Sequence, residues 1–196
     1  IGAGATINDG TTITTADNDA QLIVKCTDAD SSSGPRIEFI RDSASAANGD
    51  NIGLLVFKAA DADGNTPQEV IQFLGVLEDS ANGAEDASLD IRTVIAGNTR
   101  SRIDLEASET VFNQEAIDLD FRIEATGFNN AFRIQGSDGM ITMGKNNSSS
   151  SVEGVRLHSG VNHHITMNGG NVLLLNRGTN DGQIVGFASQ DATQGN

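Results

Sequence analysis

Residues 118–144, DLDFRIEATGFNNAFRIQGSDGMITMG, contain three short runs in which apolar and polar residues alternate. This period-two pattern predicts β-strands that have one apolar face and one polar face. Short links that contain glycine and polar residues separate the runs, as tight turns require. Each run supplies two or three apolar side chains, which are Leu119, Phe121, Ile123, Phe132, Ile134, Ile141 and Met143. That is too few for a private core, so we expect this ribbon to bury its apolar face against copies of itself.

The composition also predicts a thin core. The chain has 196 residues, of which 37% are hydrophobic, with 8 Phe and no Trp or Tyr. It has 22 Gly and only 2 Pro, which indicates many tight chain reversals rather than a proline-rich linker or a collagen repeat.

The charge of the chain argues against nucleic acid and membranes as partners. The formal net charge is -15, whereas phosphate binding needs clustered Lys and Arg. An acidic surface also repels anionic membranes, and no apolar run approaches the roughly 18 residues of a membrane span. Residues 1–10, IGAGATINDG, lack the basic and apolar regions of a secretory signal, and we interpret them as a cut or internal edge.

The strand pattern divides the chain into three parts. We expect an N-terminal connector at 1–16, an antiparallel β domain at 17–113 and a β-strand shaft at 114–196. In the second part, 69–77 is compatible with a strand or a short helix. Further strands are expected at 21–26, 36–41 and 52–59, and around Leu89, Ile91, Ile103 and Leu105. The predicted fold is all-β, with a meander or sandwich-like block ahead of the shaft.

The third part continues as short strands. Residues 145–151, KNNSSSS, are a low-complexity polar link, and 182–187 are the last apolar patch before a polar tail. Three more alternating strands are expected between them. The inward side chains predicted for the shaft are Phe121, Ile123, Phe132, Ile134, Ile141, Met143, Leu157, Met167, Leu173 and Leu175.

Two acidic pairs are candidates for catalytic carboxylates. Asp118 and Asp120 are two residues apart on one predicted strand face, which separates them by about 6.5–7 Å and overlaps the spacing of an inverting glycosidase pair. No aromatic platform or pocket accompanies them, so the interpretation we prefer is a solvated strand face. The same holds for Glu85 and Asp86, which fall in an acidic loop.

Two groups of residues are candidates for metal ligands. Asp61, Asp63 and Asn65 begin like a calcium loop, but Gly64 is misplaced and the twelfth position is Gln72 rather than Glu. The three histidines are His158, His163 and His164. A trimer axis would gather three copies of one histidine, yet adjacent strand residues face opposite sides, so strand histidines without metal are the preferred interpretation. We predict no metal site.

Enzyme chemistry has little support in the sequence. The single cysteine, Cys26, forms no internal disulfide and falls on the apolar face of the predicted strand 21–26, so we expect it to be buried. The sequence has no glycine-rich phosphate loop with Lys, no nucleophile elbow and no CxxC pair. We therefore predict no catalytic residue, no cofactor and no enzymatic activity.

The succession of these segments resembles a known family. DLDFRIEATG, NNAFRIQGSDGMITMG, VEGVRLHSG and NVLLLNRGTNDGQIVGF together are similar to the shaft of bacteriophage tail fibres and tailspikes. The earlier segments GPRIEFIRDSASAANGDNIGLLVFKAADADGN and GAEDASLDIRTVIAGNTRSRIDLEASETVFN resemble the β-rich block that precedes such shafts. The resemblance implies a homotrimeric β-prism or triple β-helix on the virion, extracellular when mature. In that family an LLLNR-type segment often leads into a C-terminal intramolecular chaperone. This sequence reaches Asn196 with no such domain, which leaves open whether one was cleaved or never present.

Two functions of different classes follow from these observations. The first is a structural tail-fibre segment that assembles as a homotrimer with other phage tail or virion proteins and supports host attachment. The alternative is a tailspike module that binds or depolymerises a host surface glycan, although sugar sites usually stack on Trp or Tyr, which this chain lacks. A bacterial surface adhesin of similar design is a third possibility. The longest polar loops, 42–51 and 78–86, are the candidate receptor contacts.

Overall fold

The computed structural model describes residues 10–32, 34–64, 66–159, 162–170 and 172–173. The chain divides into two compact units, Ile1–Ala46 and Ala47–Asn196, and all the strands lie in the second. The described residues contain ten strands and no helix, and every strand pair is antiparallel. The predicted all-β class is therefore confirmed.

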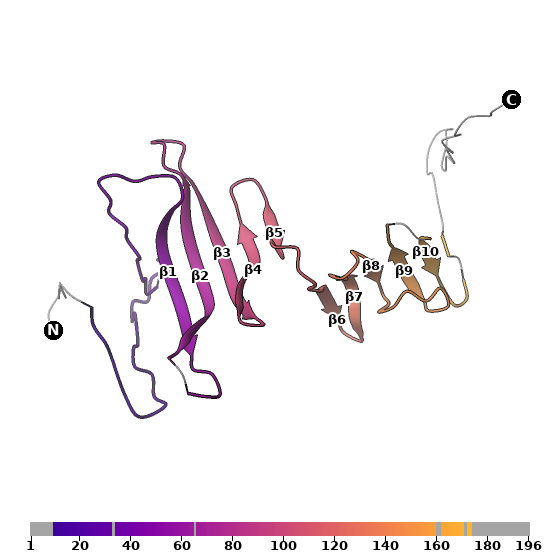
Figure 1. Ribbon diagram of the computed structural model, residues 1–196, viewed down its shortest axis with the longest axis horizontal. Coiled ribbons are helices and arrows are strands. Elements are labelled where there is room, and N and C mark those ends of the chain that lie inside the picture. The colour runs from indigo at the N-terminus through magenta and orange to yellow at the C-terminus, as the bar shows by residue number, and fades with distance from the viewer. Residues whose placement is uncertain (1–9, 33, 65, 160–161, 171, 174–196) are drawn as a thin grey trace. The chain divides into compact units, whose positions relative to one another are not determined.

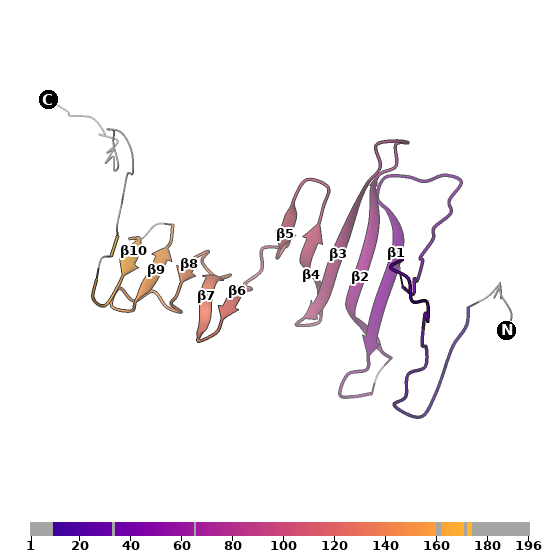
Figure 2. The same cartoon turned by 180° about the vertical axis from the view of Figure 1, so that it is seen from behind.

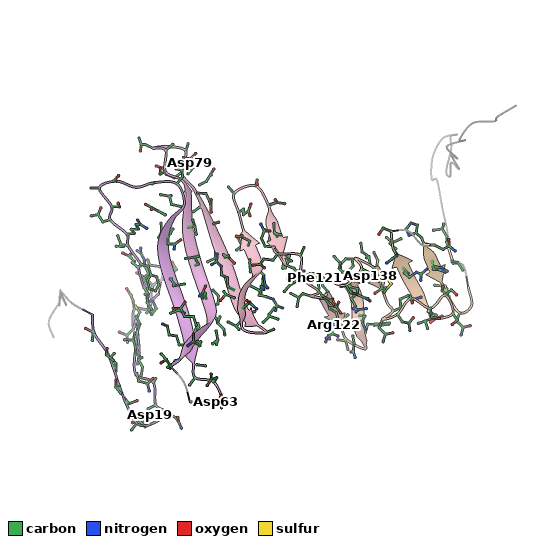
Figure 3. All side chains as sticks on the ribbon, viewed as in Figure 1. Asp19, Asp63, Asp79, Phe121, Arg122 and Asp138 are labelled. Atoms are coloured by element: carbon green, nitrogen blue, oxygen red, sulfur yellow. The ribbon has the colours of Figure 1, made fainter. Side chains whose placement is uncertain are left out.

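The first sheet is a five-stranded meander whose strands neighbour one another in chain order (Figure 1). The segment compatible with a strand or a helix forms a strand, β2. The strands are β1 (Asp50–Ala59), β2 (Gln68–Asp79), β3 (Asp86–Ile95), β4 (Asn98–Leu105) and β5 (Thr110–Phe112). Asp63 and Asp79 mark the opposite ends of this sheet in Figure 3.

A two-residue turn shows why the sequence folds into tight hairpins. Ala96 and Gly97 connect β3 to β4, and both have a positive φ, at 50° and 79°. Two positive φ values in succession define the type I′ turn, whose twist matches that of the flanking strands. The chain therefore reverses within two residues and brings Ile95 opposite Asn98.

The second sheet is another five-stranded meander, built from much shorter strands. It consists of β6 (Phe121–Ala125), β7 (Phe128–Ile134), β8 (Ile141–Met143), β9 (Gly154–Leu157) and β10 (His164–Thr166). The alternation read from the sequence is confirmed in all five strands. Leu119, Met167 and Leu173, which were expected to continue it, lie outside the strands. Leu175 and the patch at 182–187 lie outside the described residues.

Each sheet is a single layer of strands (Figures 1 and 2). Among the described residues, the buried hydrophobic side chains are Leu74 and Met140. The fully buried side chain is a threonine, Thr142. A domain of this length normally buries many more apolar side chains, so the apolar faces of both sheets are left without a cover in one copy.

Two predicted strands are wrong. Residues 21–26 and 36–41 belong to no sheet, and Leu22 and Phe39 are 69% and 62% exposed. Cys26 is also exposed rather than buried. Alternation specifies which side chains share a face, but a strand forms only when a neighbour accepts and donates its backbone hydrogen bonds. In the described part of the chain, neither segment is paired into a strand ladder.

Candidate interaction surface

The first sheet carries a line of apolar side chains across all its strands. Residues directly opposite in an antiparallel pair point to the same face. The register places one such residue of each strand in line, namely Leu55, Phe73, Ile91, Ile103 and Phe112. Phe57 and Ile71 form a parallel line beside it, as do Leu89 and Leu105. One face of this sheet is therefore apolar from edge to edge.

The second sheet repeats this arrangement with smaller strands. Four residues are in line across β6 to β9, namely Phe121, Ile134, Ile141 and Leu157. Beside this line, Ile123 of β6 lies opposite Phe132 of β7. On the other strands, Val155 of β9 lies opposite both Met143 of β8 and Ile165 of β10. The large apolar residues in these two sets thus fall on one face, as the alternation predicted.

The two lines meet at the junction between the sheets. The rings of Phe112 and Phe121 lie 5.0 Å apart between centroids, and Phe121 lies 6.2 Å from Phe132. A hollow of about 480 Å³ opens beside them and is lined by Ile103 and Ile134, among others. We call the nine residues in line the apolar row: Leu55, Phe73, Ile91, Ile103, Phe112, Phe121, Ile134, Ile141 and Leu157. It takes one residue from each of β1 to β9.

The apolar faces are accessible to solvent in one copy. Leu55 is 48% exposed and Phe112 is 50% exposed, and Ile123 and Ile165 beside the row are 51% and 49% exposed. Scattered apolar side chains are normal on protein surfaces, but a contiguous patch across several strands marks an interaction site. The apolar row is therefore the candidate functional surface of this chain.

The opposite face of the second sheet is polar, and the chain itself covers its β8–β10 part. The register aligns Arg122, Arg133, Thr142, Arg156 and His164. Arg156 donates to the carbonyl oxygens of Ser148 at 2.7 Å and Asn162 at 2.6 Å. Thr166 Oγ1 donates to the carbonyl of Ser150 at 2.9 Å. The serine-rich segment predicted as a low-complexity link is thus folded against this sheet.

Lys145 fixes the same segment from inside. Its Nζ donates to the carbonyl oxygens of Ser149 and, at 2.9 Å, of Val152, and the residue is only 3% exposed. Burial, together with the nearby charge of Arg156, lowers the pKa of Lys145. We call residues 145–152 the serine cap. The cap closes one face of the second sheet and leaves the apolar face as the surface available to a partner.

Asp120 anchors the entrance to the second sheet. Its carboxylate accepts hydrogen bonds from Arg133 Nε at 2.9 Å, Arg133 Nη2 at 2.6 Å and the Gly136 amide at 3.0 Å. The Arg133 side chain, and then the Gly136 amide, hold the pKa of Asp120 below its ordinary value. Asp118 and Asp120 precede β6, so the expectation that they share a strand face is wrong. The paired and ionised Asp120 is a structural anchor.

A carboxylate cluster on the polar face of the first sheet was missed by sequence reasoning. Asp90 and Asp104 lie directly opposite each other, and Asp90 is 5% exposed. Asp90 pairs with Arg92 at 2.5 Å. Burial and then the charge of Asp90 raise the pKa of Asp104. The alternation assigned both aspartates to the polar face, but only the register shows that they face each other.

The remaining acidic candidates act within their own loops. Glu85 Oε1 accepts a hydrogen bond from the Gly83 amide at 3.0 Å, which lowers the pKa of Glu85. Asp86 is the first residue of β3. Asp61 Oδ1 accepts from the Asp63 amide at 3.0 Å, as in an Asx turn. Gln72 lies in β2 and donates to Glu69 at 2.8 Å, and Asn65 is outside the described residues.

The histidines form a local network around β9 and β10. His158 Nε2 lies 3.4 Å from Asp138 Oδ2, and the His158 amide donates to His163 Nδ1 at 3.2 Å. His164 belongs to the polar line of the second sheet. In the described ranges, no group of three or more His, Cys, Asp or Glu side chains is arranged to hold a metal ion.

Comparison of the chain with protein-family models, with curated proteins and with solved structures finds no match. Within the described part of the chain, no helix has the length and apolar character to cross a membrane.

Proposed function

We propose that this chain is a structural segment of a homotrimeric fibre in which three copies turn their apolar rows toward a shared interior. The apolar row across nine strands carries the proposal, because five of its residues are exposed and the other four are half-buried in one copy. Full burial of a large apolar side chain contributes about 1.5–3 kcal/mol. Burial of the row therefore favours assembly, and it opposes the translational and rotational entropy that the copies lose when they associate.

The polar face of the second sheet fits the outside of such an assembly. On the second sheet, the serine cap and the exposed pair of Arg122 and Glu124, at 2.7 Å, lie on the side away from the apolar row. The net charge of -15 keeps assembled fibres apart from one another. A β-prism or triple β-helix, closed around the row, would use one face of each sheet and expose the other.

The likeness to tail-fibre shafts supplies the setting of this proposal. Under this proposal the trimer stands on a bacteriophage virion, where it joins other tail proteins and holds the host-attachment apparatus away from the particle. Residues 47–51 of the first loop lie beside the loop 78–86 at one end of the first sheet, where the Ser80 amide donates to Asn48 Oδ1 at 2.9 Å. Exposed loops on a rigid sheet are suited to receptor contact.

A matched pair of substitutions in β6 tests the trimer. Ile123 and Arg122 are adjacent in β6 and each 51% exposed in one copy, but the register places them on opposite faces. We expect sedimentation equilibrium of the full chain at micromolar concentration to give three times the chain mass. Arg122→Asn should keep that mass, whereas Ile123→Asn should weaken the trimer. A folded monomer for the unsubstituted chain would refute the proposal.

A further inference from the structure

The tripeptide Ala-Asn-Gly occurs in two loops of the first sheet. It occupies 47–49, just before β1, and 81–83, between β2 and β3. In both places the residue after the glycine donates its amide to the alanine carbonyl, at 3.2 Å in the first turn and 2.9 Å in the second. The glycines have φ values of 83° and 82°, and neither asparagine is among the residues with positive φ. Both segments are therefore type II turns with the same sequence.

An Asn-Gly pair is a reactive unit. Because glycine has no Cβ, its nitrogen can approach the carbonyl carbon of the preceding asparagine side chain. The nitrogen attacks Cγ and gives its proton to a base, the bond from Cγ to the side-chain nitrogen breaks, and ammonia leaves with that proton. Water then opens the succinimide ring to aspartate or isoaspartate. The reaction needs a side-chain amide that is free to turn, and it is faster when a base lies beside the glycine nitrogen.

The first turn holds both groups away from this reaction. Asn48 Oδ1 accepts hydrogen bonds from the Ser80 amide at 2.9 Å and from Ser80 Oγ at 2.8 Å, so the side-chain amide is held toward the neighbouring loop. The Gly49 amide donates to the Leu77 carbonyl at 2.7 Å, and a neutral carbonyl oxygen is too weak a base to remove the proton. Asn48 is exposed, so these hydrogen bonds protect it rather than burial.

The second turn leaves the asparagine free and places a base beside the glycine. Asn82 is exposed, and in the described part of the chain its side-chain amide has no hydrogen-bond partner. The Gly83 amide donates to Glu85 Oε1 at 3.0 Å, which is within the reach of a general base. This hydrogen bond lowers the pKa of Glu85, so the carboxylate is ionised at neutral pH. Asp79 Oδ1 accepts from the Ala81 amide at 2.9 Å and fixes the start of the turn.

We propose that Asn82 is a site of spontaneous deamidation in which Glu85 accepts the Gly83 proton and returns it to the leaving ammonia, whereas Asn48 is protected. The product adds a carboxylate to the loop 78–86, and the isoaspartate form also adds a methylene group to its backbone. The reaction therefore changes both the charge and the path of one candidate receptor loop. This inference does not depend on the proposed fibre.

Deamidation of the full-length chain tests the proposal. The chain is incubated at neutral pH and digested, and mass spectrometry follows the conversion of each asparagine to aspartate or isoaspartate. We expect Asn82 to convert at least about ten-fold faster than Asn48, because only the second turn has a general base at its glycine. We expect isoaspartate among the products, as the succinimide route requires. Equal rates at the two asparagines, or aspartate as the sole product, would overturn the proposal.

Glu85→Gln is the variant that tests the base. Glutamine keeps the length of the side chain and an oxygen that accepts from the Gly83 amide, but it does not take up the proton. Conversion at Asn82 should become at least about ten-fold slower. Asp86→Asn is the matched control, since it removes the same charge from the next residue, and it should leave the rate at Asn82 unchanged. Equal rates at Asn82 in the two variants would overturn the role of Glu85.

Unfolding the chain separates the effect of the fold from that of the sequence. In denaturant the two Ala-Asn-Gly segments lose their different hydrogen bonds, so we expect both asparagines to convert at similar rates. A preference for Asn82 that persists undiminished in denaturant would show that the turns do not cause it, and would overturn the proposal. Sedimentation tests the fibre separately, so either inference can fail while the other stands.

Discussion

Each of the two sheets presents part of the apolar row on one face, but the sheets are supported by different means. The strands β1 to β4 are 8–12 residues long, so the first sheet has many ladder hydrogen bonds. β8 and β10 have three residues each, and the second sheet depends on side chains that fasten it from outside. Asp120 holds its entrance and the serine cap holds its polar face. A ribbon of short strands thus needs side-chain hydrogen bonds and ion pairs to stabilise it, in addition to a partner.

The largest loss of stability is expected when a side chain is added at Gly136. A Cβ on Gly136 would lie 2.1 Å from the Leu119 backbone nitrogen, whereas one on Gly75 in the first sheet would lie 3.0 Å from the flexible Ile52 side chain. Gly136→Ala should therefore cost about 3 kcal/mol or more, and Gly75→Ala much less. Thermal unfolding of both variants checks this difference. Equal losses would show that the close approach at Gly136 does not hold the junction.

A slightly smaller loss is expected where the two apolar lines join. Phe121 contacts both Phe112 and Phe132, whereas Phe57 contacts Phe73 near the outer edge of the first sheet. Phe121→Ala should destabilise the assembly by about 2–4 kcal/mol, at the lower side of the range for buried phenylalanines. Phe57→Ala should cost less. Chemical denaturation that ranks Phe57→Ala as the more harmful change would contradict a continuous row.

A loss of about 1–3 kcal/mol in the free energy of unfolding is expected when the serine cap loses its lysine. Lys145→Met keeps much of the side-chain volume but leaves the Ser149 and Val152 carbonyls without their donor. Limited proteolysis should then cut within 145–152 while the first sheet stays resistant. Lys58→Met is the control, since Lys58 pairs with Glu69 at 3.2 Å on an exposed surface. If both variants resist proteolysis equally, the cap does not depend on Lys145.

The smallest effect is a difference in acid response between the two sheets. The pKa of Asp104 is raised in the folded chain, so protonation favours folding, and its contribution to stability increases as the pH falls toward 3.8. The pKa of Asp120 is lowered, so its stabilisation is present above 3.8 and is lost as the pH falls through the lower folded value. Unfolding of Asp104→Asn and Asp120→Asn across this pH range should show pH slopes changed in opposite directions. Slopes changed in the same direction would refute the assignment.

The sequence predicted the strands whose partners are close in the chain. Phe121, Ile134 and Ile141 alternate with polar residues and are joined by short turns, so their face and order followed from the pattern. The pattern at 36–41 is equally regular, yet it forms no strand in one copy. Alternation identifies a face, whereas strand formation also requires a neighbour that the sequence does not name.

The side-chain contacts that stabilise the second sheet could not be predicted from the sequence, because they join residues far apart in the chain. Asp120 and Arg133 are thirteen positions apart, and Arg156 reaches the Ser148 carbonyl across a turn. These contacts depend on the register of the strands and on backbone carbonyls, which composition does not reveal. Four consecutive serines therefore suggested a linker, while the buried Lys145 and the half-buried Arg156 donate hydrogen bonds to carbonyls of this segment in the structure.

Solvent access at two neighbouring positions tests most directly whether the apolar row is turned inward. In the Cys26→Ser chain, Ile123→Cys and Arg122→Cys place a thiol on opposite faces of β6 at positions equally exposed in one copy. We predict that a water-soluble maleimide labels position 122 readily in the native assembly, and position 123 only after denaturation. Equal labelling at both positions in the native protein would show that the apolar face is open, and would contradict a shared core.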